Sequence, residues 1–303
     1  MKIFSKWCLI LCVITISGIA LADDLPNVHA SAAVLINADN GELLFAKNPH
    51  AIMAPASTTK IMTAILAIEK GNLDKKITIS RSAAATPGSS MYLHRGEVQT
   101  MRNLLYGLML ASGNDSATAI AESIAGSQAG FARMMTEKAH QLGMKDTQYK
   151  NASGLPAKGH YTTAYDMALL ARYSLKNPTF AEIVQTKVTS VPSSRSRGRQ
   201  TLTNHNKLLW QYPYTTGIKT GYTRRAGKCL VASADQNGQS LITIVLKSNS
   251  MYNDSIQLFN FGFQKITPIP NSGNNSSNYH DTIDSESAGK GPVDTDTSKA
   301  SIN

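Results

Sequence analysis

Ser57 and Lys60 stand three positions apart at the start of a helix that we expect over residues 57–70. Side chains at this spacing emerge on one face of a helix, so the hydroxyl and the amine lie close together. A lysine accepts a proton from a serine only when burial or a neighbouring cation lowers the lysine's pKa. The pair therefore predicts a nucleophilic serine with a lysine as its base.

Two further motifs follow along the chain: Ser112 and Asn114 form an S-x-N motif, and K-T-G occupies residues 219–221. S-x-x-K and S-x-N are weak signals by themselves, because copies also occur in the polar C-terminal stretch at 287–290 and 272–278. K-T-G is rarer and occurs once, at the end of an expected strand. The three motifs together, in this order and on suitable elements, are a strong signal for an enzyme that uses Ser57 as nucleophile.

Hydrophobic periodicity and turn residues predict the elements around these motifs. Apolar runs on either side of Asn40-Gly41 indicate a β-hairpin over 31–47. Strands at both ends of the chain and helices between them predict an α+β fold, in which an antiparallel sheet flanked by helices pairs its first and last strands and carries an inserted helical lobe. Helices are expected over 57–70, 101–111, 115–125, 130–142 and 165–175, and strands around 184–190, 216–219, 228–234 and 241–246.

The two ends of the chain differ in composition from its middle. Residues 1–22 combine a basic start, an apolar run and a closing Ala-Leu-Ala, which predicts a signal peptide; an uncleaved membrane anchor is the alternative. Residues 266–303 are rich in Ser, Asn, Asp, Gly and Thr, so we expect a disordered tail there. One catalytic domain is thus expected over 23–265. Cys229 is its one cysteine, expected on a buried strand, so no intramolecular disulfide is expected.

The chain has 303 residues, 42% of them hydrophobic, and a formal net charge of +10. Outside the cytoplasm such a charge favours anionic wall polymers or a membrane surface over nucleic acid, with a merely solubilising charge as the alternative. Arg195, Arg197 and Arg199 alternate along an expected exposed loop or strand edge. Neither H-E-x-x-H nor G-x-S-x-G occurs, which argues against a zinc peptidase and the usual α/β-hydrolase; no metal or cofactor is expected.

The three motifs resemble those of penicillin-binding proteins and class A β-lactamases. More specifically, the chain is similar to low-molecular-mass penicillin-binding proteins of the D-alanyl-D-alanine carboxypeptidase family. The resemblance implies a β-lactamase or transpeptidase-like fold, peptidoglycan stem peptides as substrates, and β-lactam antibiotics as inhibitors. It covers roughly residues 27–265 and rests on 55–63, 110–116 and 217–223, with further matches at 151–156, 165–168 and 229–234.

The resemblance also implies roles for residues of the first two motifs. Ser57 would attack the carbonyl of the penultimate D-alanine while Lys60 takes the hydroxyl proton. Ser112 would relay a proton toward the leaving amine, and Asn114 would contact both the substrate amide and Lys60. Water then hydrolyses the acyl-enzyme, whereas penicillins trap it because they mimic the dipeptide end.

The third motif is implied to bind the end of the substrate. Lys219 keeps the site electropositive, Thr220 joins it in receiving the terminal carboxylate, and Gly221 belongs to the same substrate-binding strand. The oxyanion hole is implied to consist of the backbone N–H groups of Ser57 and Tyr222.

The chain departs from the family pattern in two ways. Some members carry an arginine before a Leu-Leu-Trp stretch that helps to hold the substrate carboxylate, and this chain has His205 there. We expect His205 to be either a cleft-edge residue or a ligand of the carboxylate. Many members also carry a β-rich second domain and an amphipathic C-terminal anchor, and the sequence indicates neither. The protein is therefore expected to be periplasmic or secreted once the signal peptide is cleaved.

Three other functions remain open at this point. A D,D-endopeptidase would use the same site to cut peptidoglycan cross-links. A class A β-lactamase would need a glutamate in an E-x-x-L-N context to activate the deacylating water, and no glutamate of this chain has that context. Slow release of bound penicillin is therefore expected. The third alternative is a non-catalytic wall-binding protein that has kept the fold.

Overall fold

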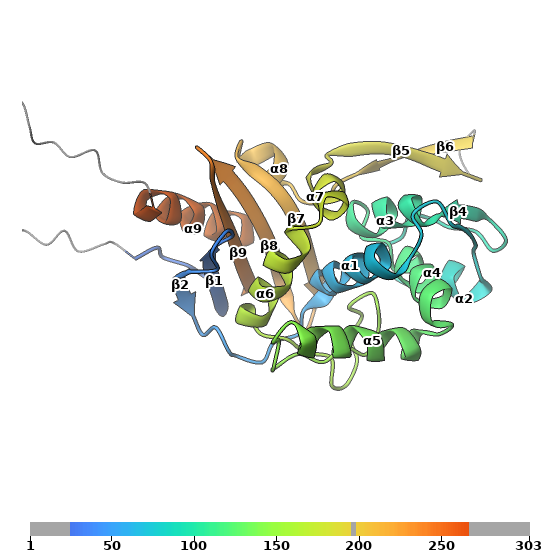
Figure 1. The fold of residues 1–303 in the computed structure, drawn as a ribbon, viewed down its shortest axis with the longest axis horizontal. Coiled ribbons are helices and arrows are strands. Elements are labelled where there is room, and N and C mark those ends of the chain that lie inside the picture. Colours follow the sequence, from blue (N-terminus) through green and yellow to red (C-terminus); the bar gives the residue numbers. More distant parts are fainter. Residues whose placement is uncertain (1–24, 195–197, 267–303) are drawn as a thin grey trace, which may run out of the picture. The chain divides into compact units, whose positions relative to one another are not determined.

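The computed structural model describes residues 25–194 and 198–266 of the 303-residue chain (Figure 1). The expected signal peptide, Arg195, Arg197 and the polar tail with its second motif copies therefore lie outside the described residues. The last described helix ends at Ile266, one residue inside the range that composition assigns to the tail. Within the described part of the chain, no helix is long and apolar enough to cross a membrane.

A five-stranded antiparallel sheet has the strand order β2-β1-β9-β8-β7 (Figure 1). Its strands are β1 (Ala32–Asn37), β2 (Leu43–Lys47), β7 (Thr215–Thr223), β8 (Gly227–Gln236) and β9 (Gln239–Ser248). β1 pairs with β9, so the predicted contact between the first and last strands is confirmed. The β1–β2 hairpin is also confirmed, with the expected positive φ at Gly41 (81°).

The helices predicted between residues 101 and 175 are all present, with ends shifted by at most two residues. Helices α2 to α5 are contributed by the sequence between β2 and β5, and they form the inserted helical lobe (Figure 1). The helices are η1 (Ala56–Thr59, a 3-10 turn), α1 (Lys60–Lys70), α2 (Arg81–Ala84), α3 (Met101–Met109), α4 (Asn114–Ala125), α5 (Gln128–Gln141), α6 (Ala164–Leu175), α7 (Pro178–Gln185), α8 (Leu208–Gln211) and α9 (Met251–Ile266).

Helix α7 differs from the expectation drawn from the sequence. An Asn-Pro pair after a helix is typical of a helix end, but Asn177-Pro178 also begins the next helix. The Asn177 side-chain oxygen accepts a hydrogen bond from the N–H of Phe180 at 3.2 Å, and the proline occupies the first turn. The strand predicted around 184–190 consequently starts later, as β5 (Val188–Ser193).

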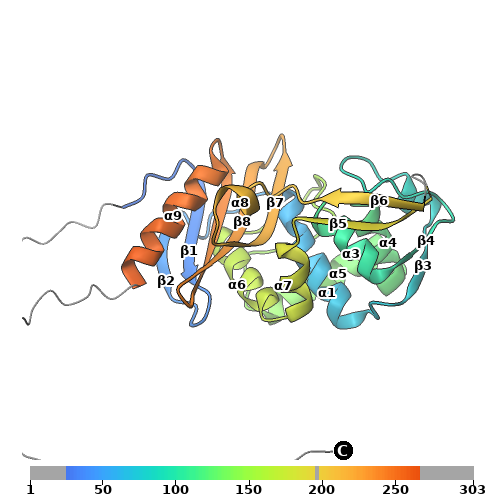
Figure 2. The same cartoon turned by 90° about the horizontal axis from the view of Figure 1, so that it is seen from above.

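Helix α9 was not expected either, and it covers one face of the five-stranded sheet (Figure 2). Its buried Leu258 and Phe259 pack in a cluster with Leu35 of β1 and Leu241 of β9. Helices α6 and α7 pack on the strands from the other side, next to α1. The sheet is therefore covered on both faces, and the central residues 229–234 of β8 and 241–246 of β9 are all buried.

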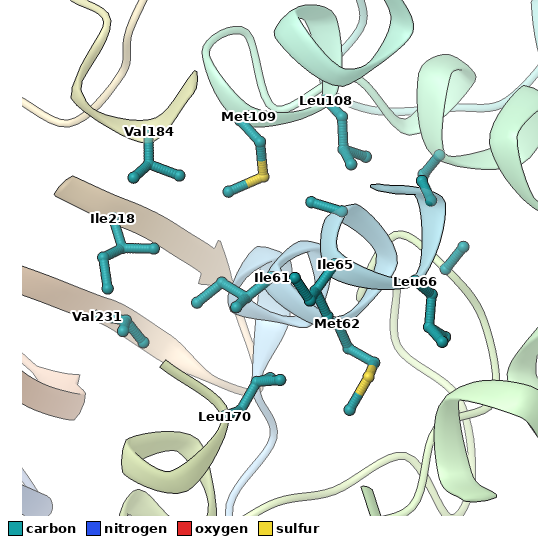
Figure 3. Close-up of a cluster of buried hydrophobic side chains, with 14 of the residues drawn as sticks. Ile61, Met62, Ile65, Leu66, Leu108, Met109, Leu170, Val184, Ile218 and Val231 are labelled. Carbon is teal, nitrogen blue, oxygen red and sulfur yellow. The ribbon is translucent and has the colours of Figure 1, made fainter. Parts of the chain in front are cut away.

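Helix α1 occupies the centre of the main hydrophobic core (Figure 3). Its side chains Ile61, Met62, Ile65 and Leu66 are buried on several sides of the helix. They meet residues of strands β7 and β8 and of helices α3, α6 and α7. Those labelled in Figure 3 are Ile218, Val231, Leu108, Met109, Leu170 and Val184. This packing holds the start of α1 between the sheet and the helical lobe.

Two short ribbons complete the described fold, β3 (Lys76–Thr78) with β4 (Val98–Thr100), and β5 with β6 (Gly198–Thr203). Arg199 lies exposed on β6, where its guanidinium donates to the Ser190 carbonyl at 2.6 Å, so its predicted strand-edge position is confirmed. Gln200 donates to the Met91 carbonyl at 2.8 Å, which ties the β5–β6 ribbon to the helical lobe.

Candidate active site

Ser57 lies in the turn η1, and the α-helix begins only at Lys60. The predicted helix start at Ser57 is therefore a tighter 3-10 turn. Ala56, directly before the serine, has a left-handed φ of 48°, a conformation that is rare for residues with a Cβ and is held here by its surroundings. The Ser57 hydroxyl oxygen lies 3.0 Å from the side-chain nitrogen of Lys60.

Lys60 is completely buried, and its side-chain nitrogen has three hydrogen-bond partners. Besides Ser57 Oγ at 3.0 Å, these are Asn114 Oδ1 at 2.8 Å and the Ser153 carbonyl at 2.6 Å. The amide and carbonyl oxygens can only accept, so they engage two N–H bonds of the amine. When the amine is neutral, the lone pair takes the remaining tetrahedral direction and faces the Ser57 hydroxyl. A neutral Lys60 is thus oriented to accept the serine proton.

The electrostatic environment favours this neutral form. Burial lowers the pKa of Lys60 well below its usual value, and the charge of Lys219 lowers it further, whereas Asp115 acts in the opposite direction. Lys219 is itself 1% exposed, and burial lowers its pKa to about 7. Among the described residues neither lysine forms an ion pair with a carboxylate. The two conditions expected for a lysine base, burial and a second lysine, are both present.

Strand β7 brings the K-T-G motif alongside η1. The Lys219 side chain donates to the Thr220 carbonyl at 3.2 Å. Gly221 approaches the turn so closely that a Cβ there would stand 3.0 Å from the Ser57 backbone nitrogen. Tyr222, next along the strand, is 66% exposed. The backbone of β7 therefore lies against the Ser57 N–H, which is one of the two groups predicted for the oxyanion hole.

The S-x-N residues lie where α3 gives way to α4, and both are buried. Ser112 has a left-handed φ of 58°, so the chain turns sharply there. The Asn114 side-chain nitrogen donates to the Pro87 carbonyl at 2.7 Å while its oxygen accepts from Lys60, and these two bonds define the orientation of the amide. The described residues show no hydrogen bond from the Ser112 hydroxyl to Ser57 or Lys60, so its relay role stays a prediction.

His205 lies exposed between β6 and α8. Its backbone N–H donates to the carbonyl of Leu110 at 3.0 Å, and Leu110 lies two positions before Ser112 in the sequence. Although the residue is exposed, partial loss of water around the ring lowers the pKa of His205, and the charge of Lys219 lowers it further. His205 thus lies at the rim of the site, near both the S-x-N and K-T-G walls.

The remaining expectations from the sequence concern Cys229 and the arrangement of potential metal ligands. Cys229 is buried on β8 as predicted, and burial raises the pKa of its thiol to about 11, so it is not a thiolate at neutral pH. Across residues 25–194 and 198–266, no group of His, Cys, Asp and Glu side chains is arranged to hold a metal ion.

Comparison with known proteins decides the family. Residues 20–250 match the model of the Peptidase_S11 family, described as D-alanyl-D-alanine carboxypeptidase. The chain belongs to this family. It is 38% identical over 250 residues to the D-alanyl-D-alanine carboxypeptidase DacF of Bacillus subtilis (strain 168), and 35% identical over 263 residues to the D-alanyl-D-alanine carboxypeptidase of Streptomyces sp. (strain K15). Each match covers 80% of this chain.

The chain spans 64% of the length of the Bacillus subtilis relative and 66% of that of DacD from Escherichia coli (strain K12), but 90% of the Streptomyces relative.

Solved structures share its fold. The Streptomyces K15 DD-transpeptidase is 32% identical, with a TM-score of 0.75 over 79% of this chain and 98% of that chain. The D-alanyl-D-alanine carboxypeptidase of Mycobacterium tuberculosis H37Rv is 29% identical, with a TM-score of 0.76 over 80% of this chain and 94% of that chain.

In this member of the carboxypeptidase family, Ser153 is a site residue that the motifs did not indicate. It contributes its backbone carbonyl to Lys60, and because every residue has a carbonyl, side-chain types carry no signal for such a role. The Asn151 side-chain oxygen accepts from the N–H groups of Ser153 and Gly154, at 3.2 and 2.8 Å, and forms the turn that presents this carbonyl. The similarity of residues 151–156 to the family was the one available indication.

Proposed function

We propose that the protein is a serine-type D-alanyl-D-alanine carboxypeptidase, which removes the terminal D-alanine of peptidoglycan stem peptides through an acyl-enzyme on Ser57. The observation that carries the proposal is the hydrogen bonding of Lys60, in which two acceptors engage two N–H bonds and leave the third direction to the Ser57 hydroxyl. Membership of the carboxypeptidase family and the two buried, unpaired lysines of the described site support the same reaction.

The proposed reaction has two steps. Ser57 Oγ attacks the carbonyl carbon of the penultimate D-alanine as its proton moves to Lys60. The tetrahedral intermediate then expels the amine of the terminal D-alanine, which takes a proton from Lys60 with Ser112 as the proposed relay. In the second step water attacks the ester and gives a proton to Lys60. Lys60 returns this proton to Ser57 Oγ as the ester bond breaks, so that the Ser57 hydroxyl is regenerated. The backbone N–H groups of Ser57 and Tyr222 stabilise the oxyanion in both steps.

Recognition of the free carboxylate is proposed for the K-T-G wall. Lys219, with a pKa of about 7, carries positive charge for part of the time at neutral pH, and a bound carboxylate favours its protonated form. Thr220 is partly exposed beside it and offers a hydroxyl. His205 is proposed as a rim residue that contacts the same end of the substrate. Asn114 contacts the amide of the stem peptide while it holds Lys60.

The proposal is tested by incubating the purified protein with uncross-linked pentapeptide muropeptides and, separately, with cross-linked dimers, and analysing the products by mass spectrometry. Loss of one terminal D-alanine from the pentapeptides is expected. Ser57→Ala is expected to abolish this loss together with covalent labelling by a fluorescent penicillin. Ser82→Ala, an exposed serine on α2, is the matched control and should keep both activities.

Three outcomes would overturn the assignment. Cleavage of the cross-linked dimers without trimming of pentapeptides would identify a D,D-endopeptidase, and absence of penicillin labelling in the wild type would identify a non-catalytic relative. Rapid turnover of nitrocefin would instead indicate a β-lactamase. The last outcome is not expected, because no glutamate stands in the E-x-x-L-N context that class A enzymes use for deacylation.

We further propose that residues 1–22 direct export and that the mature protein acts in the periplasm or outside the cell. The net charge of +10 falls to +8 when Lys2 and Lys6 leave with the signal peptide, and this positive charge favours contact with anionic wall polymers or membrane surfaces. N-terminal sequencing of the exported protein is expected to begin at Asp23. An exported protein that retains Met1 would contradict cleavage.

A further inference from the structure

His160 is a buried histidine outside all three motifs, and it contacts η1, the turn that carries Ser57 and that is called the catalytic turn below. It is 3% exposed, and its ring nitrogen Nε2 lies 3.0 Å from the hydroxyl of Thr59, the residue directly before Lys60. Its other ring nitrogen, Nδ1, lies 3.3 Å from the backbone N–H of Lys150. The ring also meets the Tyr149 ring edge-on at 5.6 Å. The histidine thus joins two segments that are about a hundred positions apart in the sequence.

These contacts define which ring nitrogen carries the proton. A backbone N–H can only donate, so Nδ1 of His160 accepts from Lys150. Nε2 then carries the hydrogen and donates it to Thr59 Oγ1. Burial lowers the pKa of His160 to about 4, and the charges of Arg225 and Lys150 contribute to this lowering. The imidazole is therefore neutral at pH 7, and the direction of both hydrogen bonds is defined.

The segment that His160 anchors is the one that orients the lysine base. Within residues 149–160, the Ser153 carbonyl accepts from Lys60 at 2.6 Å and the Ala152 carbonyl accepts from Thr63 of α1 at 2.7 Å. The histidine provides the third attachment, from the far end of the same segment to Thr59. The start of α1 and this segment are therefore joined on both sides of Lys60.

We propose that His160 is a positioning residue for acylation of Ser57: its hydrogen bond to Thr59 fixes the 149–160 segment to the catalytic turn, so that the Ser153 carbonyl orients the Lys60 amine toward the Ser57 hydroxyl. This inference rests on the proposed function. His160 acts through Thr59 and Ser153 and does not touch the substrate. No sequence pattern indicated this role, because His160 stands in none of the three motifs and Thr59 is one of the two unspecified positions of S-x-x-K.

The test measures covalent labelling of Ser57 by a fluorescent penicillin over a range of concentrations, which separates the limiting acylation rate from penicillin binding. His160→Leu keeps a side chain of similar bulk but loses the donor. It is expected to lower the limiting rate by about tenfold or more while the concentration for half-maximal rate stays within about twofold. His160→Gln, whose amide N–H reaches toward Thr59, is expected to recover most of the rate. His140→Leu, at an exposed position on α5, is the matched control and should label like the wild type.

A second variant separates positioning from loss of fold. Thr59→Val removes the hydroxyl and leaves the histidine in place, and it is expected to slow acylation to a similar degree. The double variant His160→Leu/Thr59→Val should be no slower than the slower single variant, because both changes break the same hydrogen bond. Thermal unfolding of each variant gives the folded fraction to which the rates are normalised.

The inference is wrong if the normalised limiting rate of His160→Leu equals that of the wild type, if His160→Gln is no faster than His160→Leu, or if the two single effects multiply in the double variant. These results leave the proposed function standing, since the wild type would still acylate at Ser57 and release D-alanine. Failure of the wild type to form any acyl-enzyme would overturn the proposed function, and the inference with it.

Discussion

At the scale of single residues, the chemistry depends on two buried lysines that share one site. Burial is the main cause of the low pKa of Lys60, and the charge of Lys219 is the second cause. Lys219 has a pKa of about 7 from burial alone. An amine that is neutral near pH 7 is an effective base, because enough of it is unprotonated while it still binds the proton well. Lys60 is therefore matched to its proposed task by its surroundings.

Replacing Lys219 is expected to move the pH dependence of acylation. In Lys219→Gln the nearby positive charge is lost, so the pKa of Lys60 rises and a smaller fraction of it is neutral at a given pH. The rise of the penicillin acylation rate with pH is thus expected at a higher pH than in the wild type. The measurement is the acylation rate of Ser57 between pH 5 and pH 10.

Lys219→Arg supplies the matched control for charge. Arginine stays protonated throughout this range, so the rise should occur at or below the wild-type pH. A Lys219→Gln profile that keeps the wild-type position would show that the two lysines do not interact, whatever the loss in overall rate.

At the scale of elements, the site depends on a close approach of the 149–160 segment to η1. Gly154 has a φ of 85°, and a Cβ at this position would stand 1.8 Å from the Ala56 carbonyl oxygen, which is backbone and has no other rotamer. Only a residue without a side chain permits this contact. The same segment carries the Ser153 carbonyl, so the spacing between segment and turn also defines the position of Lys60.

Gly154→Ala is accordingly expected to displace the segment from the turn and to slow acylation by roughly 100-fold, because displacements of about 1 Å in a catalytic arrangement have effects of that size. The comparison is Gly143→Ala, at a position with a φ of 79° and no atom within 4 Å of its added Cβ. Both variants bear the cost of a left-handed alanine, about 1–2 kcal/mol. An equal acylation rate in the two variants, measured on folded protein, would refute the argument from the close approach.

At the scale of the whole described domain, the sheet joins the start of the sequence to its end. β1 lies between β2 and β9, and α9 packs on them from one side, so the fold is completed only when its last strand and helix have formed. Leu35 is fully buried in this cluster, and a Cβ on Gly262 of α9 would stand 2.8 Å from its side chain. The contact lies across the sheet from α1.

Leu35→Ala is expected to destabilise the protein by about 2–5 kcal/mol, since it removes buried methyl groups and leaves a cavity. The corresponding fall in Tm is about 2–4 °C per kcal/mol for a domain of this size. Acylation of the remaining folded molecules at 25 °C should be unchanged, because Leu35 does not contact the site. Leu43→Ala, at a 47% exposed position on β2, should shift Tm very little, and a similar shift in the two variants would contradict the packing described for α9.

The sequence by itself determined the identity of the chemical groups and the order of the elements. Ser57, Lys60, Asn114 and Lys219 were recognisable because side-chain types and short spacings are local properties. The β1–β2 hairpin and the helices of the lobe were recognisable because the periodicity of apolar residues reports which face is buried. The closing of the sheet by its first and last strands followed from the order of the predicted elements.

The tertiary structure alone decided how these groups are oriented. The Ser153 carbonyl meets Lys60 across 93 positions and His160 meets Thr59 across 101, and no local pattern encodes such contacts. The start of α7 was missed because an Asn-Pro pair fits both the end of one helix and the beginning of the next. The low pKa values of the two lysines are likewise products of the fold, because desolvation exists only once the chain has closed around them.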